Sequence, residues 1–145
     1  LRERGEDISL RSPEEAGDVL ASVSANHRFT LYEYFITDKA GHAQDMNTAR
    51  LVLQNLARMI RRLLERIDLT NTTVILTSDH GNIEDLSSRS HTLNLVPTLI
   101  WGRDSIKMAT HVKSLVDITP TIVHFLTKGT AHGQSGAPDF ASASV

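Results

Sequence analysis

Residues 73–91 read Thr-Val-Ile-Leu-Thr-Ser-Asp-His-Gly-Asn-Ile-Glu-Asp-Leu-Ser-Ser-Arg-Ser-His. The β-branched and apolar side chains of residues 73–77 predict a buried strand. This strand is expected to end at Asp79 and His80, where Gly81 begins a loop that reaches His91. Ligands bind at strand ends in open α/β sheets, because the loops there diverge and leave a crevice. The stretch therefore predicts a ligand site that the rest of the chain supports or completes.

An earlier segment repeats the same order of features. Residues 29–37 are rich in aromatic and β-branched side chains and predict a second strand. This strand is followed by Asp38 and then by Gly41 and His42. Asp38 and His42 can converge on one ion if the loop begins a helical turn, because positions i and i+4 share a helix face.

The remaining elements follow from capping residues and periodicity. Ser12 and Pro13 predict the start of a first helix. Apolar side chains at helical spacing predict a second and longer helix, which ends at residue 67. Strands that alternate with helices predict an α/β fold with a mainly parallel sheet flanked by helices. We expect a domain over 1–127 and a flexible tail over 128–145. The other expected elements are helices at 13–26, 46–67 and 117–126, a strand at 96–102, and a small extra strand or turn at 105–108.

Composition excludes several classes of function. A net charge of −2 over 145 residues favours neither nucleic acid nor an anionic membrane as a partner. The chain has no cysteine, which removes disulfides and thiolate metal sites and leaves the cytoplasm as the expected compartment. No apolar run approaches the ~20 residues of a membrane span.

The Asp and His side chains suit divalent metals. Asp38, His42 and His91 can supply three ligands to one ion, and Asp79 with His80 can reach a second ion where the backbone turns. Carboxylate and imidazole ligands suit Zn, Mn or Fe. Two ions ~4 Å apart can clamp the attacking and leaving oxygens of a phosphoryl transfer. The competing interpretation is that each Asp is a helix cap and each His is solvated.

Two pairs of residues near the predicted ligands remain to be interpreted. Gly41 and Gly81 are interpreted as turn residues that allow a positive φ and the close approach of a substrate. Glu84 and Asp85 can contact the metal ligands or simply face solvent.

The order Asp-x-x-x-His, then Asp-His-Gly, then a later His resembles the alkaline phosphatase superfamily of metalloenzymes. The sequence is most similar to the cofactor-independent phosphoglycerate mutase branch, through residues 77–82 and 117–121. The resemblance covers residues 13–127 and implies the carboxy-terminal part of an alkaline-phosphatase-like domain, a half-domain with two divalent ions, Mn or Zn. It implies that one ion is held by Asp38, His42 and His91, and the other by Asp79 and His80.

The same resemblance implies that part of the site lies elsewhere. In the superfamily another Asp and a Ser or Thr nucleophile, each at the end of an earlier strand, complete the site. Neither Ser9 nor Ser12 has that context here, so the nucleophile is expected to be absent from this chain. The chain is then a phosphomutase- or phosphatase-type domain that needs an amino-terminal half, or another partner chain with the nucleophile, before it acts on a phosphate ester. A second copy of the chain is a separate candidate partner, because pairing would cover an exposed apolar sheet edge. The alternative is a non-catalytic metal-binding or assembly module.

Overall fold

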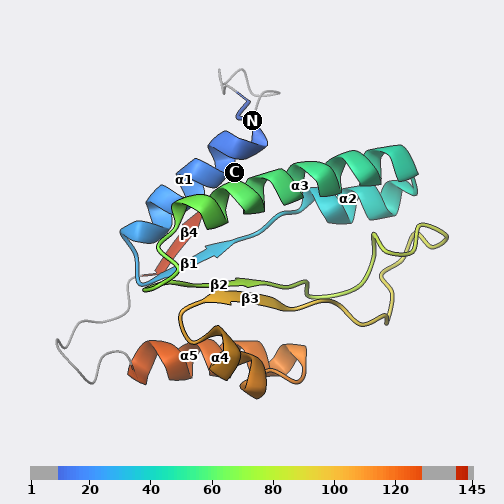
Figure 1. The fold of residues 1–145 in the computed structure, drawn as a ribbon. Coiled ribbons are helices and arrows are strands. Elements are labelled where there is room, and N and C mark those ends of the chain that lie inside the picture. Colours follow the sequence, from blue (N-terminus) through green and yellow to red (C-terminus); the bar gives the residue numbers. More distant parts are fainter. Residues whose placement is uncertain (1–9, 129–139, 144–145) are drawn as a thin grey trace.

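The chain combines helices and strands, as the sequence predicts, but the two do not strictly alternate, because β3 follows β2 with no helix between them. The structure is a computed structural model that describes residues 10–128 and 140–143. Helices α1, α2 and α3 lie above the strands, and α4 and α5 lie below them (Figure 1). The elements are α1 (Pro13–Ala25), β1 (Phe29–Tyr32), α2 (Ile36–Ala43), α3 (Met46–Arg66), β2 (Thr73–Leu76), β3 (Leu99–Gly102), α4 (Ser105–His111), a 3₁₀ turn (Leu115–Asp117), α5 (Ile118–Lys128) and β4 (Phe140–Ala143).

The predicted helices at 13–26 and 46–67 are confirmed as α1 and α3. Ser12 and Glu15 form the capping box that starts α1. Gly17 lets α1 pack closely on α3, because a Cβ at this position would lie 2.6 Å from the carbonyl oxygen of Met59. Arg62 of α3 joins the helices further through a bidentate ion pair with Asp18. These contacts fix the helical layer above the strands.

The first strand is shorter than predicted, and this correction changes the setting of Asp38. Strand β1 ends at Tyr32, and residues 36–43 form helix α2 instead of a strand end followed by a loop. The strand propensity of residues 33–37 is overridden by packing, because Ala40 and Gly41 are buried and Ala40 clusters with Ala49 and Val52 of α3. Asp38 therefore lies in the first turn of a helix.

The expected mainly parallel sheet is not what the described strands form. They make two separate pairs, of which β1–β4 is parallel and β2–β3 is antiparallel. A parallel neighbour needs a crossover, usually through a helix. Residues 77–98 contain no helix, so the chain returns from β2 along a long loop and pairs in the antiparallel sense (Figure 1).

Two further predictions from the carboxy-terminal third are corrected, and one is confirmed. Residues 105–108 belong to helix α4, which starts directly after a left-handed residue, Asp104, at φ 56°. Strand β3 begins at Leu99 instead of residue 96. The predicted helix at 117–126 is confirmed as α5, which follows a 3₁₀ turn over Leu115–Asp117. Within the expected flexible tail, residues 140–143 form β4, and residues 129–139 and 144–145 lie outside the described residues.

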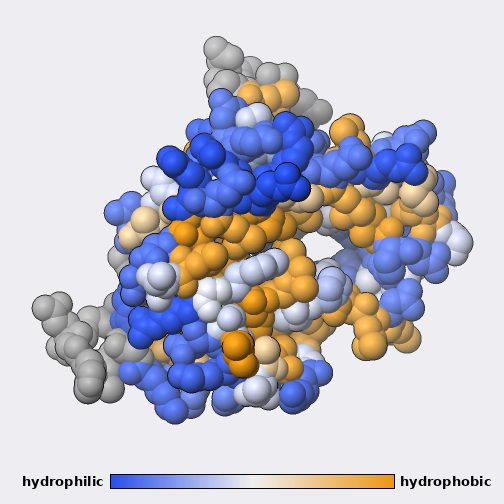
Figure 2. Space-filling view, in the orientation of Figure 1, coloured by the Kyte–Doolittle hydropathy of each residue, from blue (hydrophilic) through white to orange (hydrophobic). Residues whose placement is uncertain are grey.

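Much apolar surface in the described part of the chain stays exposed. No large side chain there is fully buried, and the side chains of Phe35, Leu93 and Leu95 are 62%, 104% and 99% exposed. Figure 2 shows apolar side chains gathered in a band between the upper helices and the strands. Among residues 10–128 and 140–143, no helix combines the length and the apolar composition needed to cross a bilayer.

Candidate metal centre

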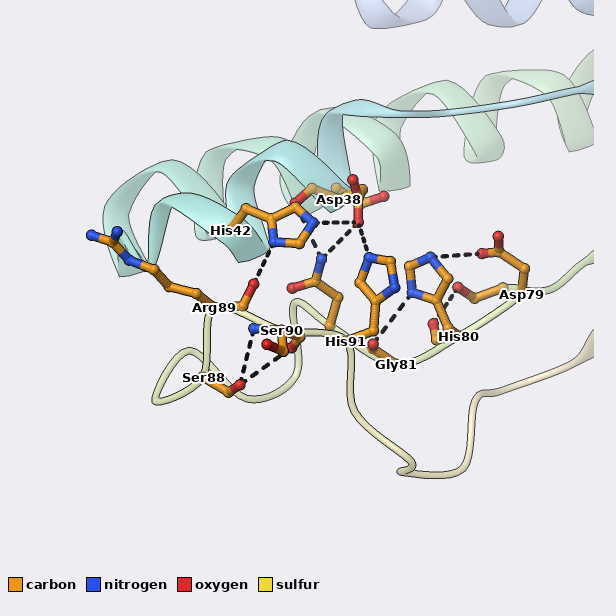
Figure 3. Close-up of polar contacts among 12 residues, drawn as sticks. Asp38, His42, Asp79, His80, Gly81, Ser88, Arg89, Ser90 and His91 are labelled. Carbon is orange, nitrogen blue, oxygen red and sulfur yellow. Dashed lines mark hydrogen bonds and ion pairs between the residues drawn. The ribbon is translucent and has the colours of Figure 1, made fainter.

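Helix α2 and the loop after β2 bring the predicted ligands together (Figure 3). Asp38 and His42 lie one turn apart on α2, and His91 approaches from the loop. The Nε2 atoms of both histidines lie 3.3 Å from the same Asp38 oxygen, Oδ1. One ligand atom from each of the three residues lies within 4.8 Å of the others.

This spacing fits a divalent ion. Ligands ~2.0–2.1 Å from a tetrahedral ion are about 3.3 Å apart, which matches the separation between Asp38 and each imidazole. The Nδ1 of His42 faces the carbonyl oxygen of Arg89, which can only accept a hydrogen bond. Nδ1 must therefore carry a proton, which leaves Nε2, the atom that faces Asp38, as the ring atom that could bind a metal. Two imidazoles and one carboxylate are a ligand set that suits Zn or Mn.

His80 and Asp79 form a second pair beside this cluster. The imidazole of His80 stacks on that of His91, with ring centroids 3.5 Å apart and planes 15° from parallel. The His80 Nε2 lies 3.6 Å from Asp79 Oδ1 on the side away from Asp38 (Figure 3). The Asp79 side chain is 86% exposed. Asp79 Oδ1 and His80 Nε2 therefore lie close enough to each other to be ligands of one ion.

The charge of Asp38 is stabilised by its neighbours. The side-chain amide of Asn82 donates to Asp38 Oδ1 at 2.7 Å and holds the pKa of that carboxyl below its usual range. The nearby imidazoles of His42, His91 and His80 lower this pKa further. An ionised carboxylate is the form that binds a metal.

Two glycines permit these contacts, although not by the mechanism that the sequence suggests. Neither Gly41 nor Gly81 has a positive φ, and among the described glycines only Gly102 does, at 85°. Their role is close approach of protein groups. A Cβ on Gly41 would lie 2.1 Å from the side-chain oxygen of Asn82, and a Cβ on Gly81 would lie 2.2 Å from Thr92 Oγ1.

Glu84 fastens the two ends of the loop, which settles a question that the sequence leaves open. Its Oε2 accepts the backbone N–H of Asn82 at 2.6 Å. Its Oε1 accepts the hydroxyl of Thr92 and, at 3.1 Å, the amide of Asn94. The backbone N–H of Thr92 also donates to the carbonyl oxygen of Gly81 at 2.9 Å. The loop is thereby held closed, so that His91 returns to His80.

Sequence reasoning did not assign roles to Asn82, Gln44 and Arg89. Gln44 donates to the carbonyl oxygen of Leu86 and accepts from Arg89, which ties the loop to the end of α2. Asn82 directly follows Asp-His-Gly, and this position is the only feature of the sequence that indicates a role in the site. The other two have no signal, because their partners lie more than 40 residues away.

The comparisons place the chain in a family. The sequence model of the Metalloenzyme superfamily matches residues 11–128, so the chain belongs to this superfamily. Its relatives include proteins named 2,3-bisphosphoglycerate-independent phosphoglycerate mutase, which confirms the resemblance drawn from the motifs. That of Antithamnion sp. is 32% identical over 118 residues, which cover 76% of this chain and 23% of the relative. That of Dinoroseobacter shibae is 29% identical over 124 residues, with 79% and 24% covered.

The match is confined to part of each relative. The chain spans about a quarter of the length of these curated relatives. No solved structure matches the chain. Membership of the superfamily implies the use of divalent metal.

Glu84 gives a prediction about acid stability. Its hydrogen bonds, led by that from Thr92, lower its pKa from 4.5 to about 2 in the folded chain. The folded state thus binds this proton less readily than the unfolded state does. The stabilisation from Glu84 is complete above pH 4.5 and is lost as the pH falls from there toward 2. Glu84→Gln should therefore be less stable at neutral pH and should lose less of its remaining stability between pH 4.5 and 2.

The measurement is the urea midpoint of the wild type and of Glu84→Gln at closely spaced pH values. Glu33→Gln is the control, because Glu33 is also exposed and lies in the irregular segment between β1 and α2. Curves for the wild type and Glu84→Gln that run parallel through this pH range would contradict the prediction.

Proposed function

We propose that this chain is the metal-binding part of a phosphoryl-transfer domain of the phosphomutase or phosphatase type. Asp38, His42 and His91 hold one divalent ion, and Asp79 with His80 contributes to a second. The observation that carries the proposal is the convergence of the three ligand atoms within 4.8 Å. The superfamily match and the phosphoglycerate mutase relatives support the same assignment.

The roles of the residues follow from their chemistry. When bound, the ions would supply positive charge that stabilises the transferring phosphoryl group. Asp38 supplies negative charge on the face of α2 that it shares with His42. His42 and His91 would each supply Nε2 as a ligand atom, since both Nε2 atoms lie 3.3 Å from Asp38 Oδ1, and His80 orients His91 by stacking on it. The nucleophile, a Ser or Thr, comes from a segment outside these residues, and the substrate is a phosphate ester.

Metal-dependent stability tests this proposal. The chain is freed of metal with a chelator, and its thermal midpoint is measured with and without Mn²⁺ or Zn²⁺. A ligand that binds only the folded state at 100 times its Kd adds about 2.7 kcal/mol, which should raise the midpoint of a chain of this size by roughly 5–10 °C. The proposal is wrong if neither ion changes the midpoint.

The second candidate function is a non-catalytic metal-binding module that assembles with another copy of itself or with an amino-terminal half. The observation that favours it is the exposed apolar surface, to which Leu93, Leu95 and Phe35 contribute. Sedimentation equilibrium separates the alternatives. A chain that is monomeric at all concentrations excludes self-association and leaves the amino-terminal half as the partner.

A further inference from the structure

Asn82 is the residue that joins the loop to Asp38. It is 5% exposed, and it is one of two buried polar residues in the described part of the chain. Its side-chain nitrogen donates to Asp38 twice, to Oδ1 at 2.7 Å and to the backbone carbonyl oxygen at 3.3 Å. Its backbone N–H is held by Glu84 at 2.6 Å. Asn82 is thus fixed from the loop side and directed at one carboxylate.

The orientation of the amide is settled by its neighbours. Both Asp38 atoms that it meets can only accept hydrogen bonds, so the nitrogen must face them. The side-chain oxygen then faces Gly41, is buried, and has no hydrogen-bond partner. A buried carbonyl oxygen without a partner is costly, and a glycine inside a helix costs stability relative to alanine. The unpaired oxygen of Asn82 and the helical Gly41 lie against each other. This arrangement lets the nitrogen of the same amide hold the carboxylate of Asp38 in place.

We propose that Asn82 is a positioning residue of the metal centre. Its amide holds the carboxylate of Asp38 against His42 and His91, and Gly41 leaves the space in which the amide lies. Without this hydrogen bond the Asp38 side chain, which is 40% exposed, can rotate toward solvent. This inference rests on the proposed function, because it concerns the same ion.

Gly41→Ala tests the contact without touching a ligand. The added methyl group displaces the side-chain oxygen of Asn82, the end of a side chain that can move, and so breaks its bond to Asp38. Alanine also favours the helix at this position, so α2 itself should not be destabilised. We expect about 10- to 100-fold weaker binding of Mn²⁺ or Zn²⁺, the effect typical of losing a group that orients a ligand. The thermal midpoint of the metal-free chain should fall by only a few degrees, because the gain in helix propensity offsets part of the crowding around Asn82.

Asn82→Ala approaches the same contact from the loop. It should weaken metal binding to a similar extent, and the double variant should be little worse than either single one, because both break one interaction. Affinities are measured by calorimetry on the full 145-residue chain. The control is Lys39→Ala, an exposed substitution on α2 that should leave the affinity unchanged. If Asn82→Ala does not fold, Gly41→Ala decides alone.

The outcomes separate this inference from the proposed function. Asp38→Asn removes a ligand and serves as the reference for loss of the site. A wild-type chain that binds neither ion overturns both proposals. The positioning role alone is overturned if Asp38→Asn abolishes binding while Gly41→Ala and Asn82→Ala each keep the affinity within two-fold of the wild type. It is also overturned if the losses of affinity in the two single variants add fully in the double variant.

Discussion

Replacing His91 by alanine is expected to weaken binding of the first divalent ion by about 100-fold or more, beyond the range for groups that only orient a ligand. The Nε2 of His91 lies 3.3 Å from Asp38 Oδ1, at the same distance as that of His42. Removing either imidazole leaves one histidine and one carboxylate, which is too few protein ligands for a stable Zn²⁺ or Mn²⁺ site. The metal-dependent rise in the thermal midpoint should disappear with it.

His80 should behave differently, although its ring touches that of His91. Its Nε2 faces Asp79 at 3.6 Å, so it belongs to the second ion in the proposed arrangement. His80→Ala should lower the number of ions bound and should affect the first ion only modestly, through loss of the stacking contact. The difference between the two variants tests whether the five side chains serve one ion or two.

Calorimetric titration with Mn²⁺ and Zn²⁺ gives both affinity and stoichiometry. His27→Ala is the matched control, because His27 bonds to the carbonyl oxygen of Val23 at the end of α1 and has no place in the site. Equal losses in His27→Ala and His91→Ala would show that the effect is general destabilisation. Unchanged binding in both His42→Ala and His91→Ala would mean that the ligands are wrongly assigned.

The site could be predicted further from the sequence than the fold could. Asp38 and His42 are separated by one helical turn, and Asp79 and His80 directly follow an apolar run. The positions of these four residues can therefore be predicted mostly from their local spacing in the sequence. His91 joins them because the loop after β2 returns to α2 and brings His91 beside Asp38. The sequence suggests this return only through the resemblance to a family in which a later His follows Asp-His-Gly. That these five residues bind metal stays a prediction.

The strands were harder to predict, because their limits and partners depend on distant contacts. The aromatic and β-branched residues before Asp38 favour a strand locally, yet burial of Ala40 beside α3 makes residues 36–43 helical. The antiparallel pairing of β2 with β3 is set by a loop that lacks a crossover helix. The contact of Asn82 with Gly41 joins residues that no local periodicity relates.

Adding an amino-terminal segment that carries a nucleophile is expected to convert this chain from inactive to active. The segment would come from a similar protein, such as the phosphoglycerate mutase of Dinoroseobacter shibae, of whose length the present chain covers only 24%. We expect no detectable turnover of a phosphate ester by the chain alone. Together with the segment it should show turnover that requires Mn²⁺ or Zn²⁺, because catalysis of this transfer depends on positioning a nucleophile against bound positive charge.

The metal ligands of this chain should control that activity. Asp38→Asn should reduce turnover by about 1,000-fold or more, since loss of even one group that stabilises charge in the transition state costs ~10²–10³-fold. Release of inorganic phosphate from p-nitrophenyl phosphate measures hydrolysis, and interconversion of phosphoglycerates measures mutase activity. The segment alone, the mixture with a chelator, and the mixture with Lys39→Ala are the controls. If the mixture associates and binds metal but never turns over either substrate, phosphoryl transfer is excluded, and the exposed apolar surface together with the Asp–His cluster is better explained by a metal-binding assembly module.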